Sequence, residues 1–441
     1  MAEEKTSTLV RVVALGLVLM LALGAAGAHA ASAVMADMVR RAPDAALAAP
    51  APTALAQDAF TRSLAVSSAE RPEPATVAYA SELAGVGGGQ VAEAQVAFDD
   101  AWLIGGSRAY NNDLAATCAA LSAAVNAQSS YGAPGGRAYA VEALGALGFR
   151  DVDVSAYEGR SRVADEVANM LTGSTDVAAY AIARKELVAA DGRASGDVVL
   201  VGVRGTYGSE WLSNFNCALG PEAGEADHRG FARAADEVRS ALGAYLERFG
   251  LDPRTTHVLL CGHSRGGAVA NLLAADLIDE GSYAGVHAYT FAAPNSTRAP
   301  ERAGGAYAGI FNVANPADAV PSLPLAAWGY GAYGTTVELP AREHVAYRAA
   351  YNRMSAARSA ITRCEVVGDR RQGPLPADAL EACAAALARA SEGSGGALAL
   401  AQAAGELASI DVTSALTAHS PDTYLAWLQT ANPATFTFKT R

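Results

Sequence analysis

Short apolar runs of strand length alternate with amphipathic helical segments through the middle of the chain. The apolar runs are Asp197–Val203, His257–Cys261, Val286–Ala292 and Ile310–Val313. Between the first two runs, Phe231–Phe249 repeats apolar residues at helical spacing, which places them on one face of a helix. Strands separated by helical crossovers predict an α/β fold with a mostly parallel central sheet flanked by helices.

Helices are also expected before and after this region. Asn111–Ala127 and Gly136–Leu147 show helical spacing of apolar residues ahead of the first strand. Residues 341–412 are rich in alanine, carry no strand pattern and are interrupted by Gly368–Pro376 and Ser391–Gly396. We interpret 341–412 as a helical insertion in the sheet domain.

The N-terminus has the pattern of an export segment. Val12–Ala28 contains no charged residue, and Lys5 and Arg11 precede or border it. At ~1.5 Å per residue this run makes a helix of about 26 Å, shorter than the ~30 Å hydrocarbon core of a membrane. Ala28-His29-Ala30 has the small residues of a signal-peptidase site. We predict that residues 1–30 form an export helix, either a cleaved signal peptide or a retained membrane anchor.

The next segment differs in composition from the rest of the chain. Residues 31–90 are rich in alanine and proline, and Ala49-Pro50-Ala51-Pro52 and Arg71-Pro72-Glu73-Pro74 disfavour a helix. We interpret 31–90 as a flexible linker and 91–441 as the folded domain that contains the insertion.

Composition limits the partners and cofactors. The 441 residues include 33 Lys+Arg and 45 Asp+Glu, which gives a formal net charge of −12. This acidic balance, without a long basic run, argues against a nucleic-acid partner. The sequence has no CxxC pair and no HExxH motif, and we expect neither a metal nor an organic cofactor.

Five cysteines leave at least one without an intramolecular partner. Cys364 and Cys383 could close a loop in the insertion, and Cys118 and Cys217 are a possible second pair, although spacing alone does not define connectivity. Cys261 ends an apolar run and is expected to be a small buried side chain.

One motif carries specific chemistry. Gly262-His263-Ser264-Arg265-Gly266 fits the pattern G-x-S-x-G. The apolar run His257–Cys261 leads into it and the helical segment Ala268–Ile278 follows, which is the strand–turn–helix context that the motif requires. Glycines two residues before and after the serine remove Cβ atoms that would collide in such a turn. Ser264 is therefore the candidate nucleophile.

A serine hydroxyl needs a base that takes its proton and an acid that orients the base. With this type of turn the acid and then the histidine follow the serine along the chain. Asp318 is the candidate acid because it follows the strand at Ile310–Val313. His419, directly before a final helix, is the preferred base, and His344 is the alternative. His263, inside the turn, is expected to point away from the serine.

Backbone amides must stabilise the oxyanion of the transition state. Arg265, the residue after the nucleophile, supplies one candidate amide. Thr206 lies on the loop that leaves the strand at Asp197–Val203, and is the second candidate through its amide and its hydroxyl.

Together these blocks resemble the signature motifs of the class 3 lipases. The matching blocks are Val203-Arg204-Gly205-Thr206, Glu210-Trp211-Leu212, His228-Arg229-Gly230-Phe231, Gly262-His263-Ser264-Arg265-Gly266-Gly267, Asp318-Ala319-Val320-Pro321 and the block from His419 to Tyr424. The resemblance implies an α/β-hydrolase fold and a triad of Ser264, Asp318 and His419. Arg265 departs from the Leu or Met often found after the serine in that family.

From these motifs we expect an exported serine hydrolase that cleaves carboxylic esters, especially lipid esters such as acylglycerols, at a membrane or lipid surface. Its expected location is secreted or in the cell envelope, with residues 12–28 as a possible anchor. An esterase or amidase for small or peptide substrates is one alternative, and a catalytically silent envelope-binding module is another. The insertion at 341–412 is expected to cap the Ser264 pocket, or alternatively to pack against the side of the sheet.

Overall fold

The computed structural model describes most of the chain beyond residue 71. The described residues are 72–81, 83, 91–104, 108–128, 138–155, 178–205, 226–299, 305–323, 329–363, 379, 382 and 412–440. Among them no helix is long and apolar enough to cross a membrane. The predicted export segment 1–30 lies outside the described residues.

An eight-stranded sheet organises the molecule, in the order β10-β9-β8-β7-β6-β5-β4-β3. Its strands are β3 (Arg150–Val154), β4 (Tyr180–Val188), β5 (Ala194–Val203), β6 (Thr256–His263), β7 (Gly285–Phe291), β8 (Ile310–Ala314), β9 (Thr335–Glu338) and β10 (Thr437–Thr440). The five strands from β5 to β9 are parallel. The outer strands β3, β4 and β10 pair antiparallel, so the parallel centre of the sheet is flanked by antiparallel strands on both sides.

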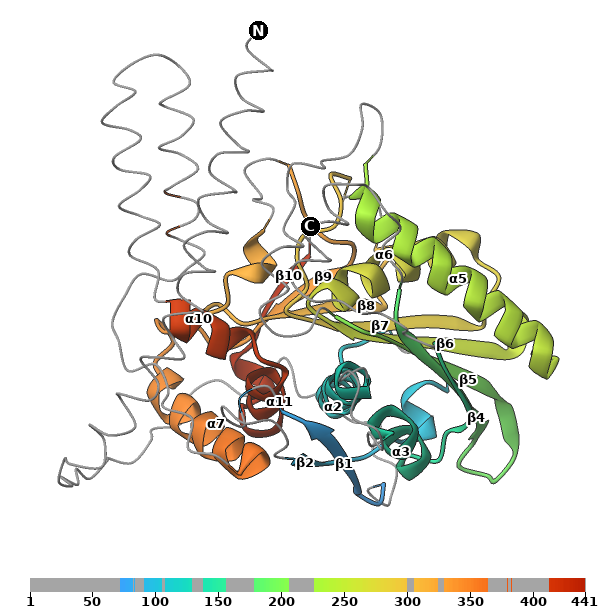
Figure 1. Ribbon diagram of the computed structural model, residues 1–441, viewed down its shortest axis with the longest axis horizontal. Helices are drawn as coiled ribbons and strands as arrows, with labels where there is room; N and C mark the ends of the chain where they lie inside the picture. The colour runs from blue at the N-terminus through green and yellow to red at the C-terminus, as the bar shows by residue number, and fades with distance from the viewer. Residues whose placement is uncertain are drawn as a thin grey trace, which may run out of the picture.

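Helices cover both faces of this sheet (Figure 1). One face carries α5 (Arg229–Phe249) and α6 (Arg265–Glu280), and the other carries α2 (Asn112–Gln128), α3 (Tyr139–Ala146) and α11 (Pro421–Thr430). Alternate residues of β5 serve the two layers: Val199 and Val201 pack with α5 and α6, whereas Val198 and Leu200 pack with the α2 side. Burial on both faces explains why the strand reads as a continuous apolar run.

A two-stranded antiparallel hairpin lies beyond the α2 layer. It consists of β1 (Ala75–Ala80) and β2 (Val91–Val96), with Ala75 opposite Val96 and Ala80 opposite Val91. The hairpin packs against α2 and α3. Strand β1 falls inside the segment 31–90 that we interpreted as a linker, so that interpretation is wrong for Ala75–Ala80. The hairpin is buried on one face, with Val77 and Tyr79 almost fully enclosed.

The predicted α/β fold, with a mostly parallel central sheet and helices on both of its faces, is confirmed. The structure adds strands that the sequence pattern did not indicate, namely β1, β2, β3, β4, β9 and β10. Short 3₁₀ helices connect several elements, at Asp100–Trp102, Pro253–Thr255, Val320–Ser322 and Pro433–Thr435.

The insertion predicted at 341–412 is described only in part. Its first helix, α7 (Tyr347–Thr362), runs along α11, and the rings of Tyr347 and Tyr351 lie 6.0 and 6.3 Å from that of Trp427. It also contacts β2, so α7 covers the hairpin side of α11 (Figure 1). Apart from two isolated positions, 364–411 lies outside the described residues, and a cap over Ser264 stays a prediction. Helix α10 (Val412–His419) follows this segment.

Two of the five cysteines face each other between α2 and the central sheet. Cys118 of α2 and Cys261 of β6 are free and fully buried. Burial raises the pKa of Cys118 well above its ordinary value, and a hydrogen bond with Cys261 acts in the same direction. Cys118 is therefore not paired with Cys217, whereas the burial expected for Cys261 is confirmed. Cys217, Cys364 and Cys383 lie outside the described residues.

Two histidines are buried side by side near the starts of β6 and β7, at the end of the sheet opposite Ser264. The ring centroids of His257 and His287 are 6.1 Å apart. Burial, together with smaller electrostatic effects of His257 and Arg108, lowers the pKa of His287 to about 4. Burial also lowers the pKa of His257. Both rings are thus held neutral in the folded protein.

We expect the free energy of unfolding to decrease as the pH falls from about 6.5 to about 4. The unfolded His287 binds its proton near pH 6.5, whereas the folded side chain resists it until about pH 4. The unfolded state therefore gains protons first, at a cost to stability of up to about 3 kcal/mol from this group. Urea unfolding of the parent and of His287→Gln, at about pH 7 and about pH 4.5, measures this loss. An equal pH dependence in both proteins would contradict the prediction.

Candidate active site

The serine of the G-x-S-x-G motif stands at a sharp turn between β6 and α6. Ser264 has φ 55° and ψ −128°, a conformation that residues with a side chain rarely adopt. Its N–H donates to the carbonyl of Phe291 at the end of β7 (2.8 Å), and its own carbonyl accepts from Gly267 (2.9 Å). The neighbouring strand and the first turn of α6 together hold this strained backbone in place.

The glycines of the motif are required by close backbone approaches. A Cβ atom on Gly262 would lie 2.4 Å from the carbonyl oxygen of Gly266, and one on Gly266 would lie 2.3 Å from that of Val203. Real Cβ atoms do not approach backbone atoms so closely. The spacing of the motif therefore follows from how tightly α6 folds back on β6 and β5.

The candidate acid lies in the turn that leaves β8. Asn315 shapes this turn, because its side-chain oxygen accepts from the N–H of Ala317 (3.1 Å) and its carbonyl accepts from the N–H of Asp318 (2.9 Å). Asp318 is 2 % exposed. Its Oδ1 accepts from the backbone N–H of Val320 (2.9 Å), which leaves Oδ2 directed at the histidine.

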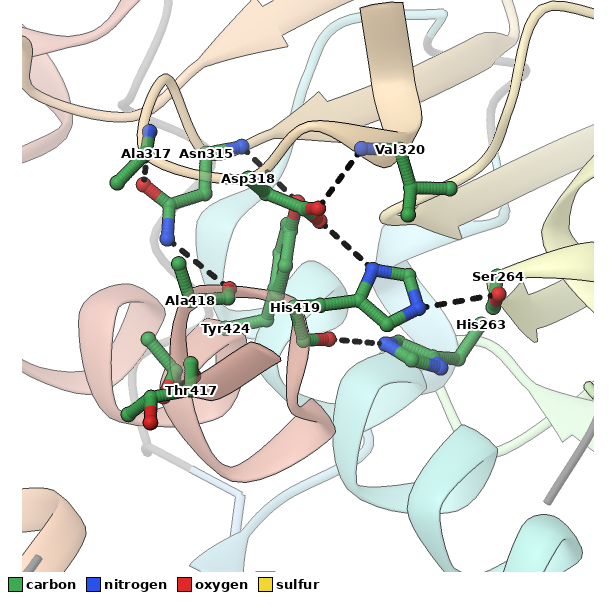
Figure 2. Close-up of polar contacts among 11 residues, drawn as sticks. His263, Ser264, Asn315, Ala317, Asp318, Val320, Thr417, Ala418, His419 and Tyr424 are labelled. Atoms are coloured by element: carbon green, nitrogen blue, oxygen red, sulfur yellow. Dashed lines mark hydrogen bonds and ion pairs between the residues drawn. The ribbon is translucent and has the colours of Figure 1, made fainter. Parts of the chain in front are cut away.

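His419 lies between the serine and the aspartate (Figure 2). Its Nδ1 is 2.9 Å from Asp318 Oδ2 and its Nε2 is 3.1 Å from Ser264 Oγ. The histidine ends α10, and Ser420 follows it as the N-cap of α11. The structure thus brings together the three side chains that the sequence singled out, from segments that are 101 and 155 residues apart in the chain.

The alternative base does not take part in this cluster. His344 is exposed, and its Nδ1 accepts from the backbone N–H of Ala346 (3.1 Å) in the turn before α7. His257 and His287 lie at the far end of the sheet, as described above. Among the described histidines, His263 and His419 are the ones that lie next to Ser264.

Two further side chains hold His419 and Asp318, and sequence reasoning missed both. The Tyr424 hydroxyl donates to Asp318 Oδ2 (2.8 Å) and accepts from the N–H of Asn315 (3.0 Å). Tyr424 is fully buried, and burial next to Asp318 raises its pKa well above the ordinary value. Its place on the first turns of the final helix, shortly after His419, was the available signal.

The second is His263, whose ring does not point away from the site as expected. His263 Nε2 lies 2.7 Å from the carbonyl oxygen of His419, and the two ring centroids are 4.8 Å apart (Figure 2). Since a carbonyl only accepts, Nε2 carries the proton here. Burial lowers the pKa of His263 well below its ordinary value, as does the nearby His419 ring, so His263 is neutral.

The surroundings of the oxyanion candidates are partly described. Arg265 is the first residue of α6, so its backbone amide directly follows the nucleophile. Thr206 lies outside the described residues, but the preceding Gly205 donates its N–H to the side chain of Asn126 on α2 (2.9 Å). A Cβ atom on Gly205 would lie 3.5 Å from the Cβ of Ser264. The loop leaving β5 therefore passes directly beside the serine.

No group of three or more metal-ligating side chains occurs among the described residues. The cluster contains a hydroxyl, an imidazole and a carboxylate in hydrogen-bonding sequence, which is the arrangement that activates a serine for attack on a carbonyl carbon.

A comparison with sequence families identifies the central part of the chain. Residues 200–328 match the class 3 lipase family. This match confirms the resemblance seen in the motifs, and it includes Ser264 and Asp318. His419 and the hairpin lie outside the matched class 3 lipase segment. A comparison with curated protein sequences finds no match.

Fungal lipases are among the solved structures similar to this chain. A Rhizomucor miehei lipase propeptide complex is 21 % identical, with 52 % of this chain and 66 % of that chain covered and a TM-score of 0.36. A lipase from Rhizopus microsporus var. chinensis is 18 % identical, with coverages of 51 % and 72 % and a TM-score of 0.33. An MDLA mutant form from Penicillium cyclopium is 24 % identical, with coverages of 53 % and 80 % and a TM-score of 0.33.

Replacing the second glycine of the motif should destabilise the fold. Gly266→Ala places a methyl group against the backbone of Val203 and Arg204, and we expect it to lower the free energy of unfolding by about 3 kcal/mol. Gly243→Ala on α5 is a matched control, because no atom lies within 4 Å of its Cβ position. As a substitution in the interior of a helix it should stabilise by up to about 1 kcal/mol. Equal melting temperatures for the two variants would contradict the prediction, because the turn would then have room for a methyl group that the structure does not show.

Proposed function

We propose that this protein is a serine hydrolase that cleaves carboxylic esters, in particular lipid esters such as acylglycerols. The observation that carries the proposal is the continuous hydrogen-bonded chain from Ser264 through His419 to Asp318. The lipase-class segment at 200–328 supports the same chemistry.

The hydrogen-bond donors and acceptors assign the proton on His419. Asp318 Oδ2 is an acceptor, so Nδ1 carries the hydrogen and donates to it, which leaves the lone pair of Nε2 directed at Ser264 Oγ. In this tautomer His419 can accept the serine proton as Ser264 attacks. Asp318 then stabilises the imidazolium that forms.

The reaction proceeds through two acyl transfers. Ser264 Oγ forms a bond to the ester carbonyl carbon while His419 Nε2 takes its proton. The tetrahedral intermediate collapses when the ester C–O bond breaks, and His419 returns the proton to the departing alcohol. Water then attacks the acyl-enzyme while His419 takes its proton. The bond between the acyl carbon and Ser264 Oγ breaks, His419 returns the proton to Oγ, and the acid product leaves.

The negative charge on the carbonyl oxygen needs hydrogen-bond donors. The amide of Arg265 is one proposed donor, since it follows Ser264 at the N-terminus of α6, where the helix dipole also favours negative charge. Thr206 is the proposed second donor because its neighbour Gly205 lies beside the serine. Each such donor typically contributes ~3 kcal/mol to catalysis.

Substrate class and location complete the proposal. Export by residues 1–30, by cleavage or as an anchor, would place the enzyme outside the cytoplasmic membrane, where lipid esters are presented at a membrane or lipid surface. No metal or organic cofactor takes part in the proposed steps, because the serine, histidine and aspartate supply the nucleophile and the proton transfers.

Ser264→Ala should abolish ester hydrolysis. The variant lacks the nucleophile, and in triad enzymes such a loss approaches ~10⁶-fold in kcat. Hydrolysis of a chromogenic ester and labelling by a fluorophosphonate probe measure this effect. Ser240→Ala on α5 is the matched control, because it removes an exposed serine hydroxyl that bonds only within its own helix. Activity of Ser264→Ala within about tenfold of the parent would overturn the assignment. A parent that is neither active nor labelled would support a silent binding module.

A series of ester substrates distinguishes a lipase from an esterase. We expect turnover to rise with acyl-chain length and to rise again when the ester forms an emulsion, since a lipase acts on substrate at an interface. Full-length protein and protein lacking residues 1–30 should show the same preference. Activity restricted to short, dissolved esters or to amides would instead favour the esterase or amidase alternative.

A further inference from the structure

A second buried carboxylate lies close in sequence to the proposed catalytic histidine, in the first turn of α11, the helix that follows the histidine. Asp422 is 1 % exposed and sits in the first turn of α11, three residues after His419. It does not touch Ser264 or Asp318 in the hydrogen bonds that the structure shows. The proposed reaction therefore does not use it, although its burial carries a desolvation cost.

Three hydroxyl groups surround this carboxylate. Tyr79 donates to Oδ1 (2.8 Å), while Ser81 and Ser420 donate to Oδ2 (2.8 and 2.9 Å). Burial raises the pKa of Asp422 above its ordinary value, and the hydrogen bonds from these hydroxyls and the nearby Arg358 offset only part of this rise. Tyr79, which belongs to β1, has its own pKa raised well above the ordinary value by burial and by Asp422.

Ser420 connects this carboxylate to the histidine. It is the residue directly after His419 and the N-cap of α11, and its hydroxyl oxygen accepts from the N–H of Asp422 (3.3 Å) while its hydrogen goes to the carboxylate. The direction in which the chain leaves His419 is therefore determined by Asp422. A carboxylate at this place also interacts favourably with the helix N-terminus.

Helix α11 is thus held from two sides. Tyr424 joins it to Asp318 in the turn after β8, and Asp422 joins it to Tyr79 and Ser81 of the hairpin. Thr423, between them, accepts from the guanidinium of Arg358 on α7 (3.0 Å). Consecutive residues of one helix turn are fixed to three separate elements, and His419 directly precedes that turn.

We propose that Asp422 is a positioning residue for His419. Through Tyr79 and Ser81, the β1–β2 hairpin is then also a part of the catalytic machinery, although it lies far from Ser264 in the sequence. This inference rests on the proposed function. It extends that function to a segment outside the 200–328 match, because the hairpin holds the imidazole within reach of Ser264.

The structure offers a close control for the test. Tyr307 also donates its hydroxyl to a carboxylate, shared between Oδ1 and Oδ2 of Asp279 (3.0 and 3.1 Å), and both residues lie on the α6 side of the sheet. Tyr79→Phe and Tyr307→Phe therefore each remove the hydroxyl that bonds a tyrosine to an aspartate. Only the bond of Tyr79 leads to His419.

Steady-state kinetics on one soluble ester and the rate of fluorophosphonate labelling are measured well below the melting temperature of each variant. For Tyr79→Phe we expect kcat and the labelling rate to fall about tenfold with KM nearly unchanged, because misplacement of a catalytic group affects the transition state most. Ser81→Ala should show the same pattern, and Ser81→Thr, which keeps the hydroxyl, should restore kcat. Tyr307→Phe should leave kcat within about twofold of the parent.

Equal kcat values for Tyr79→Phe and Tyr307→Phe would overturn the proposal, as would a change confined to KM or to stability. A parent that hydrolyses no ester would instead refute the proposed function. Crystal structures then still decide the positioning role: in Tyr79→Phe the distance from Ser264 Oγ to His419 Nε2 should exceed the 3.1 Å of the parent. An unchanged distance would exclude the positioning role.

Discussion

The active-site arrangement depends on keeping one imidazole between a hydroxyl and a carboxylate that come from distant parts of the chain. The histidine side chain is buried, and its two nitrogens are within hydrogen-bonding distance of Ser264 and Asp318. Strand order makes this possible, because β6 and β8 end at the same edge of the parallel sheet. The helices around α11 then have to bring the histidine to that edge.

The two buried carboxylates of this region are held in different ways. Asp318 receives a backbone amide, a tyrosine hydroxyl and the histidine, so it is prepared for a positive charge that appears on the imidazole. Asp422 receives hydroxyls and lies near the fixed positive charge of Arg358, so its surroundings need no change during a reaction. In the proposed mechanism Asp318 responds to proton transfer, whereas Asp422 keeps the geometry constant.

Local sequence patterns predicted those elements whose characteristic residues lie within a few positions of one another. The strand, glycine turn and helix around Ser264 are such a case, because burial and steric limits act on neighbouring positions. Strand β4 was not predicted because Arg184, Lys185 and Glu186 interrupt its apolar pattern. Strand β1 was not predicted because an alanine-rich strand with prolines before it and glycines after it resembles a linker. His263 and Tyr424 required knowledge of which segments meet in space. Long-range hydrogen bonds leave no periodic trace in a sequence.

The place of His419 has a consequence for the order in which the protein is made. Ser264 and Asp318 emerge from the ribosome well before the histidine, while the hairpin that supports α11 emerges before all three. After the histidine, β10 must still join the sheet beside β9. A nascent chain therefore carries the proposed nucleophile, Ser264, without its proposed base until the segment with His419 is synthesised and docks. On the proposed assignment, competence to attack an ester would arise only when the two ends of the folded region meet.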